Sequence, residues 1–179
     1  NKPFSMNRIP SLMLLLAGLA TGVLNGVLAQ TPDWLFVLEG SYVGRYEVPD
    51  ANGDLSVQDA RWDGKRNGKE DGFVLQISRE LGATVSKEAQ VWTWNSQESL
   101  LNLMVLEDGV RKESQWFCET NGPATILTRG GNRGQRAAII RLRMERLPGQ
   151  LRVQEHANFG DGEWILQWRY VLDDYMGED

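Results

Sequence analysis

The chain has 179 residues, of which 41% are hydrophobic and 24% are charged, a size and composition that fit one globular domain. Acidic side chains (24) outnumber basic ones (19), which argues against binding to nucleic acid or to an anionic membrane surface. Cys118 is the only cysteine, so an internal disulfide is excluded and the fold depends on its hydrophobic core.

Residues 1–29 are expected to comprise a few upstream residues and a cleavable signal peptide that begins at Met6. A short basic start is followed by the almost uncharged apolar run 11–29, which closes on small residues. We expect cleavage just before Gln30, which predicts an exported protein, periplasmic or secreted, with residues 30–179 as one domain that does not insert into a membrane. An uncleaved membrane anchor is the alternative, but polar residues inside the run weaken it.

A short helix over 32–38 is expected next, followed by a series of strands. Turn dipeptides such as Asn52-Gly53 and Asp108-Gly109 recur along the chain, and they favour the positive φ that hairpin turns require. Their spacing of roughly ten residues is typical of an all-β fold with hairpin connections. The expected strands are 41–49, 55–62, 73–80, 85–95, 99–107, 110–119, 124–129, 136–147, 151–159 and 164–172.

Several of these strands alternate between apolar and polar residues. Phe73, Leu75 and Ile77 share one face of their strand, so one face of the sheet is expected to be buried and apolar and the other exposed to solvent. An open sheet of so many strands would expose its edges, and closure into a barrel removes them. We therefore predict an antiparallel up-and-down barrel of about 8–10 strands. A β-sandwich is the alternative, although the Cys…Trp…Cys pattern of many sandwiches is missing.

The stretch GSYVGRYEVP at 40–49 carries features suited to closing a barrel. Gly44 lacks a side chain, which lets a strand coil strongly where the barrel closes. Tyr42 and Tyr46 fall on one face, where they are expected to fill the closed end. Gly40, Tyr42 and Gly44 are therefore predicted as barrel-closing residues.

The short helix and Gly40-Ser41-Tyr42-Val43-Gly44 together resemble the start of calycin barrels, in which lipocalins carry Gly-x-Trp. The chain resembles exported bacterial lipocalin-like barrels of unknown function more closely than it resembles the lipocalins. These bacterial barrels open on Gly-x-Trp-x-Gly and carry later elements that correspond here to Trp62-Asp63-Gly64 and Asp161-Gly162-Glu163-Trp164, although Tyr42 stands where Trp is expected. The resemblance implies that Arg169 stacks on the first-strand aromatic as a barrel-closing residue; the alternative is that Arg169 is solvated on the outer face.

Seven tryptophans are the main oddity of the composition. Trp92 and Trp94 share one face of a strand, as do Trp164 and Trp168. Core packing explains such residues, and so does an aromatic-lined cavity for a flat or apolar ligand or a sugar ring. The predicted ligand-binding residues are Tyr46, Trp92, Trp94, Trp116, Trp164 and Trp168.

Other candidate sites are weaker. His156 is the only histidine and alternates with apolar residues of its strand, so we interpret it as a surface residue and predict neither metal nor haem. Cys118 has no nearby base and is interpreted as a packed thiol. The basic, glycine-rich segment Gly130–Gly134 is either a flexible hairpin loop or a cradle for an anion. No catalytic residue or cofactor is assigned.

Three functions are consistent with these patterns. The first is a barrel that binds a small hydrophobic or amphipathic molecule without chemistry. The second is a structural or protein-interaction barrel of the cell envelope with a filled core. The third is a cavity enzyme, an isomerase or hydrolase, that uses groups such as Asp59, Glu113 or Tyr46. A hollow interior favours the first function over the second.

Overall fold

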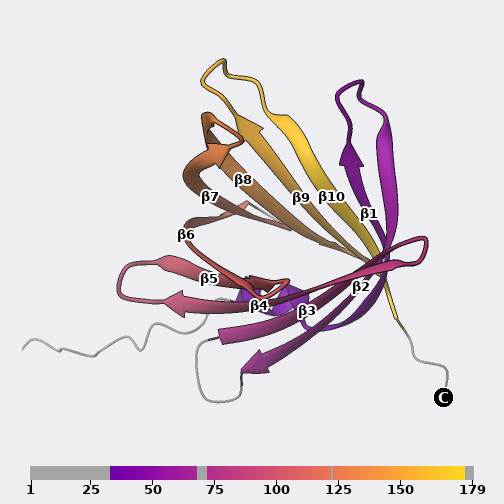
Figure 1. Cartoon of the computed structure of the whole chain (residues 1–179). Coiled ribbons are helices and arrows are strands. Elements are labelled where there is room, and N and C mark those ends of the chain that lie inside the picture. Colours follow the sequence, from indigo (N-terminus) through magenta and orange to yellow (C-terminus); the bar gives the residue numbers. More distant parts are fainter. Residues whose placement is uncertain (1–32, 68–71, 122, 176–179) are drawn as a thin grey trace, which may run out of the picture.

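The computed structural model describes residues 33–67, 72–121 and 123–175. Ten antiparallel strands close into a barrel in which each strand pairs with its neighbours in the chain and β1 pairs with β10 (Figure 1). The predicted up-and-down barrel is confirmed, and the sandwich alternative is wrong. The predicted signal peptide and cleavage site lie outside the described residues. Within them, no helix is long and apolar enough to cross a membrane.

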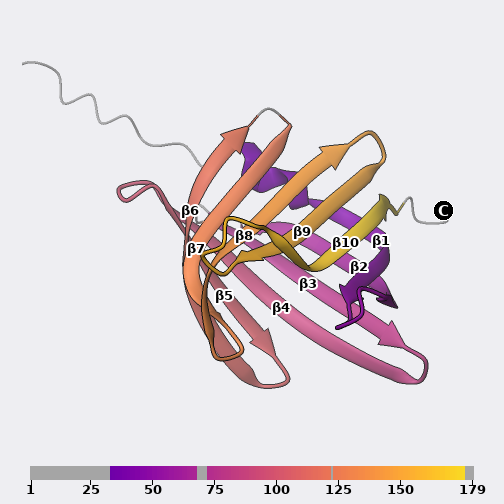
Figure 2. The same cartoon turned by 90° about the horizontal axis from the view of Figure 1, so that it is seen from above.

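The elements follow one another through short turns. The 3-10 helix η1 (Asp33–Leu38) comes first. The strands are β1 (Gly40–Pro49), β2 (Leu55–Asn67), β3 (Gly72–Leu81), β4 (Thr84–Asn95), β5 (Leu100–Glu107), β6 (Val110–Asn121), β7 (Ala124–Arg133), β8 (Arg136–Leu147), β9 (Gln150–Asn158) and β10 (Ile165–Asp174). Seen from above, β7–β10 run in a different direction from β2–β4, as expected of tilted strands in a barrel (Figure 2).

The glycine-rich segment is not the loop that its composition indicated. Gly130 and Gly131 pair with Ile139 and Ala138 of β8, so they continue β7 as far as Arg133. The turn is confined to its end, where Gly134 takes a φ of 58°. The prediction of a flexible loop is therefore wrong for residues 130–133, because the ladder of backbone hydrogen bonds with β8 overrides the weak strand preference of glycine. The alternative of an anion cradle stays a prediction.

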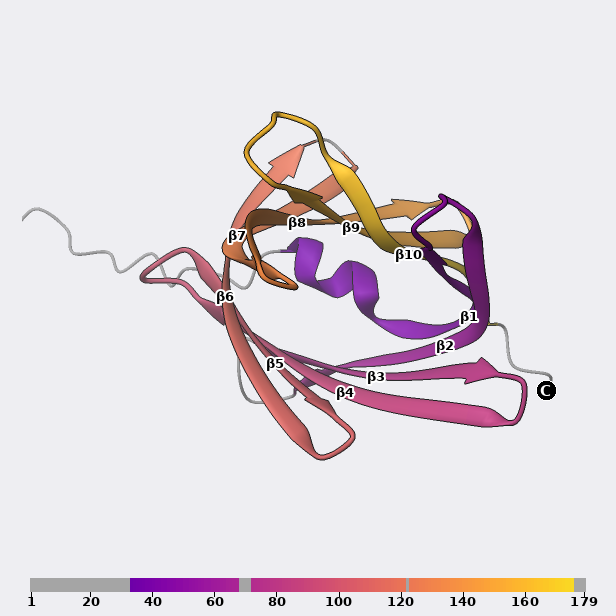
Figure 3. The ribbon, with the colours of Figure 1, turned by 45° about the horizontal axis from the view of Figure 1, so that its top comes forward.

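One end of the barrel is closed by η1. Leu35 and Leu38 of the helix are fully buried, and Figure 3 shows the helix between the strand groups β2–β5 and β7–β10. A Cβ at Gly64 would lie 2.1 Å from the carbonyl oxygen of Leu38, so only glycine lets the helix end rest on β2. The Tyr42 hydroxyl donates to the carbonyl of Glu39 at 2.7 Å and ties β1 to the segment after η1.

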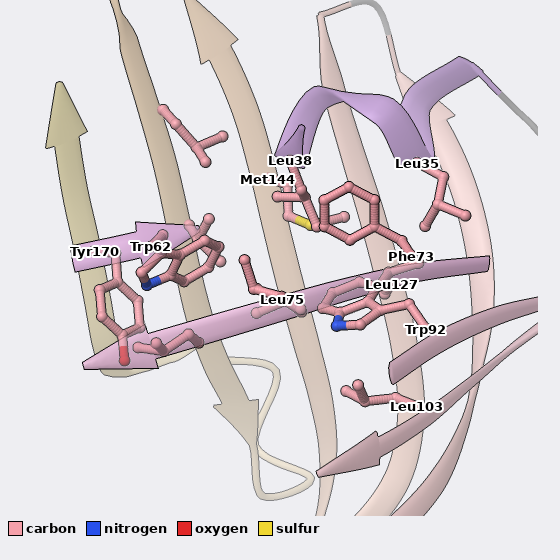
Figure 4. Packing of buried hydrophobic residues seen from close by; sticks show 14 of the residues in the cluster. Leu35, Leu38, Trp62, Phe73, Leu75, Trp92, Leu103, Leu127, Met144 and Tyr170 are labelled. Atoms are coloured by element: carbon pink, nitrogen blue, oxygen red, sulfur yellow. The ribbon is translucent and has the colours of Figure 1, made fainter. Parts of the chain in front are cut away.

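The hydrophobic core lies directly against this helix. Phe73, Leu75, Trp92, Leu127 and Met144 gather there from β3, β4, β7 and β8, and each is at most 2% exposed (Figure 4). These side chains pack tightly enough to fill that part of the interior. Polar residues line the rest of the interior, so a binding site is expected there.

Candidate functional site

The barrel interior contains a pocket of about 400 Å³. That volume lies within the range of sites for small molecules, about 300 to 1,000 Å³. Apolar side chains of β5, β8 and β9 form part of the wall, among them Leu103, Leu142 and Val153. Its aromatic lining residues are Tyr46, Trp62, Trp92, Trp116, Trp168 and Tyr170. The interior is thus filled at the helix end and hollow beyond it.

Four aromatic side chains form a continuous cluster on one wall. The ring centroid of Tyr170 lies 4.6 Å from that of Tyr46, 4.8 Å from that of Trp62 and 5.6 Å from that of Trp168. Figure 4 shows the side chains of Trp62, from β2, and Tyr170, from β10, side by side. Tilted and edge-to-face contacts of this kind stabilise a rigid wall, against which a flat molecule finds apolar surface.

The six predicted ligand-binding residues divide into two groups. Tyr46, Trp92, Trp116 and Trp168 line the pocket. Trp94 packs against the core cluster and is not among the residues that line the pocket.

Trp164 lies on the outer face, where the Arg141 guanidinium stacks on its ring at 3.8 Å. The prediction that Trp164 and Trp168 share a face is wrong because the register shifts between Leu166 and Trp168. A β-bulge adds one residue to the strand, so the side chains before it point to the opposite face from those after it.

Arg79 of β3 is the centre of a polar network in the pocket. Its guanidinium donates to Glu88 at 3.1 Å and to Glu107 at 2.5 Å, and it lies 3.4 Å from the hydroxyl of Tyr170. Burial alone lowers the pKa of Arg79, but Tyr170 and the two carboxylates outweigh it, and the net pKa is raised. The Arg79 side chain is only 12% exposed, so it is a fixed cation inside the barrel.

A chain of hydrogen bonds extends this network along β4. The indole Nε1 of Trp92 donates to the side-chain oxygen of Gln90 at 2.7 Å, and the Gln90 amide donates to Glu88 at 2.5 Å. The polar residues that alternate with Trp92 along β4 therefore face the interior. They hold the Trp92 ring in one orientation against the pocket.

Glu155 of β9 is a second buried charge. Its side chain is 7% exposed and accepts a hydrogen bond from Arg133. Burial raises the pKa of Glu155, and the opposing effects of Arg133 and Arg129 do not cancel it. Glu155 thus faces two arginines of β7, of which Arg133 bonds to it directly.

Arg129 lies deeper in β7 and lines the pocket. Its guanidinium is 4.7 Å from the centroid of the Trp116 ring, and its Nη1 donates to the carbonyl of Gly130 at 3.4 Å. The buried Nε of Arg129 has no hydrogen-bond partner. Burial and the neighbouring Arg133 lower the pKa of Arg129.

The residues predicted to close the barrel lie near the join between β1 and β10. Gly40 opens β1 with a φ of 124°, and Tyr42 is 2% exposed. Arg169 does not stack on Tyr42: it bonds to Glu47 on the outer face, whereas Arg146 of β8 lies over the Tyr42 ring at 5.0 Å. The stacking implied for Arg169 is wrong, because Arg169 alternates with the inward-facing Trp168 and Tyr170.

Of the three groups named for a cavity enzyme, Tyr46 and Glu113 line the pocket and Asp59 does not. Asp59 is exposed, and Glu113 bonds to Arg111 at the rim. His156 faces outward opposite Arg141, and burial and this arginine lower its pKa. Burial raises the pKa of the half-buried Cys118 thiol to about 11. Among the described residues, no three His, Cys, Asp or Glu side chains form a group able to hold a metal ion.

Several pocket residues carried no prediction. Arg79 and Glu155 are the clearest, because each continues the apolar side of its strand: Arg79 follows Phe73, Leu75 and Ile77 at a spacing of two. A charge at an apolar position of an alternating strand marks a polar group inside the barrel. The pocket residues without a prediction include Trp62, Arg79, Glu88, Gln90, Arg129, Glu155 and Tyr170.

The fold and the pocket together define a ten-stranded, lipocalin-like barrel with a hollow interior. A solved structure with this fold is the S-type phycobiliprotein lyase CPES from Guillardia theta, at a TM-score of 0.55 and 11% sequence identity, covering 82% of this chain and 93% of that one. No family model and no curated protein matches the sequence. At this identity the likeness shows the fold alone.

Proposed function

We propose that the protein binds a small amphipathic molecule inside the barrel and carries it without chemical change. The observation that carries the proposal is the pocket of about 400 Å³, whose wall combines aromatic rings with a few fixed charges. A structural barrel with a filled core has no need of such a space. The neighbour with the same fold is named as a lyase of phycobiliproteins, which supports a role for this fold in handling small molecules.

The affinity is expected in the micromolar range. Burying about 200 to 300 Å² of apolar ligand surface at about 25 cal/mol per Å² contributes about 5 to 7.5 kcal/mol. The loss of ligand freedom on binding offsets part of this gain.

Titration with the neutral fluorophore N-phenyl-1-naphthylamine tests the proposal. We expect probe emission to rise with a micromolar dissociation constant. Val105→Trp should abolish the rise because Val105 lines the pocket, so the larger ring occupies its space. Ile139→Trp, on the outer face where the side chain is 50% exposed, is the control and should leave binding unchanged. If the probe fails to bind, or binds the Val105→Trp protein as well as the unaltered one, the carrier function is wrong.

We also propose that the barrel acts outside the cytoplasm. The support is the basic start and apolar run of residues 6–29, which have the pattern of a signal peptide. The intact mass of the exported protein should correspond to a chain that begins at Gln30. An exported protein that retains Met6 to Ala29 would contradict cleavage at this site.

A further inference from the structure

Two buried hydrogen-bond donors in the pocket wall lack an acceptor. They are the Nε of Arg129 on β7 and the Nε1 of Trp62 on β2, and both residues line the pocket. Trp62 as a whole is only 2% exposed. A buried donor without a partner costs free energy, which an acceptor on a ligand would recover.

Among the described residues, the carboxylates of the pocket pair with cations other than Arg129. Glu88 and Glu107 are both bound by Arg79, and Glu155 is bound by Arg133. In the described part of the chain, by contrast, no carboxylate lies within ion-pair distance of Arg129. A guanidinium presents a planar fork of donors that matches a carboxylate.

Arg129 also stands where the pocket reaches solvent. Pairing between β6 and β7 ends at Phe117 and Thr128. We call this end of the pairing the β6–β7 seam. Beyond it the β5–β6 hairpin and the β7–β8 hairpin lie apart in both Figure 1 and Figure 3. Lys112 and Glu113 line the pocket from this separated part of β6, and their side chains are 63% and 61% exposed.

A single negative charge fits this site better than two. The carboxylates that line the pocket are each paired with a cation, which leaves the single positive charge of Arg129. One negative charge on the ligand balances it, whereas a dianion such as a phosphate monoester would bring a second charge without a partner. The Trp116 ring under the Arg129 guanidinium, and the aromatic wall opposite, offer flat apolar surface to the rest of the ligand.

We propose, on the basis of the carrier function above, that the ligand is a flat monocarboxylate. Its carboxylate is bound by the Arg129 guanidinium at the β6–β7 seam, and its apolar body lies against the aromatic side chains of the pocket.

The test compares 1-pyrenebutyrate with its neutral amide, 1-pyrenebutyramide. Both have the same flat body, so a difference in affinity reports on the charge. The unaltered protein should bind the carboxylate about 10-fold more tightly than the amide. Arg129→Gln should remove this preference by weakening carboxylate binding alone, and Arg129→Lys, which keeps the charge, should retain part of it.

Arg141→Gln is the matched control. Arg141 also stacks on a tryptophan and also has a buried Nε without a partner, but it lies on the outer face. This variant should keep the preference for the carboxylate. Pyrenyl-butyl phosphate, a dianion with the same ring, should bind more weakly than the carboxylate.

The two pyrenes are compared on the unaltered protein, so this result does not depend on whether any variant folds. Equal affinity for the two pyrenes, or an equal effect of the Arg129 and Arg141 substitutions, would overturn the monocarboxylate assignment. Failure of both pyrenes to bind would overturn it as well. In each case the neutral naphthylamine probe tests the carrier function separately. If the pyrenyl phosphate binds more tightly than the carboxylate, the ligand is assigned as a dianion in place of the monocarboxylate.

Discussion

Replacement of Gly44 by alanine should destabilise the barrel by about 2 to 4 kcal/mol. A Cβ at this position would lie 2.2 Å from the carbonyl oxygen of Val171 and 2.9 Å from the Cα of Leu172. Both are backbone atoms of β10, so relief requires that the two strands move apart. Their separation would weaken the pairing that closes the barrel.

Gly130→Ala is the control for this substitution. Gly130 also lies within a strand, but apart from its own residue and its two chain neighbours no atom lies within 4 Å of the position that a Cβ would take. Its free energy of unfolding should change by less than about 0.5 kcal/mol. Urea unfolding followed by tryptophan emission compares the two proteins, and equal stabilities would show that the approach of β1 to β10 imposes no steric limit.

Replacement of Arg79 by methionine should lower the free energy of unfolding by about 3 kcal/mol. Its two carboxylate partners, Glu88 and Glu107, are 10% and 30% exposed. The substitution leaves the more buried Glu88 without its cation, whereas Glu107 keeps Lys112 at 3.4 Å. Methionine has a similar length and removes little packing volume. The loss therefore measures the charge left uncompensated inside the barrel.

Arg111→Met provides the matched comparison. Arg111 pairs with Glu113, but these side chains are 66% and 61% exposed. An exposed pair contributes at most about 1 kcal/mol, so this variant should be nearly as stable as the unaltered protein. Adding Glu88→Gln to Arg79→Met should restore part of the lost stability, because one unpaired carboxylate is then removed. If Arg79→Met is no more destabilising than Arg111→Met, the buried network does not stabilise the fold.

The barrel could be predicted from the sequence because its topology depends on local patterns. Turn dipeptides determine where each hairpin reverses, and alternation determines which face is dry. When successive strands pair with each other, little more information is needed to predict the topology of the barrel. The glycines of β7 were misinterpreted because strand pairing with β8, a non-local effect, decides their conformation.

The site was less predictable, for reasons that particular residues show. Trp164 was misplaced because the bulge after Leu166 leaves no mark in the alternation. Arg146, and not Arg169, reaches the Tyr42 ring because inter-strand register decides which arginine lies over it. The pocket itself depends on the sum of interior side-chain volumes, which no short motif encodes. Four of the predicted aromatic residues do line the pocket, and Arg79 and Glu155 could have been found as charges at apolar positions of their strands.

The join between β1 and β10 differs from every other join in the barrel, since it alone links strands from opposite ends of the chain. All the other pairs are hairpins, which form between residues close in sequence. Here Tyr42 pairs with Asp174, so forming this one join costs the entropy of closing a loop that contains all the strands between β1 and β10. Folding speed is limited by such long-range pairing. During synthesis, β1 has no partner on this side until the last strand is made, and the nine preceding strands form a curved sheet with two open edges.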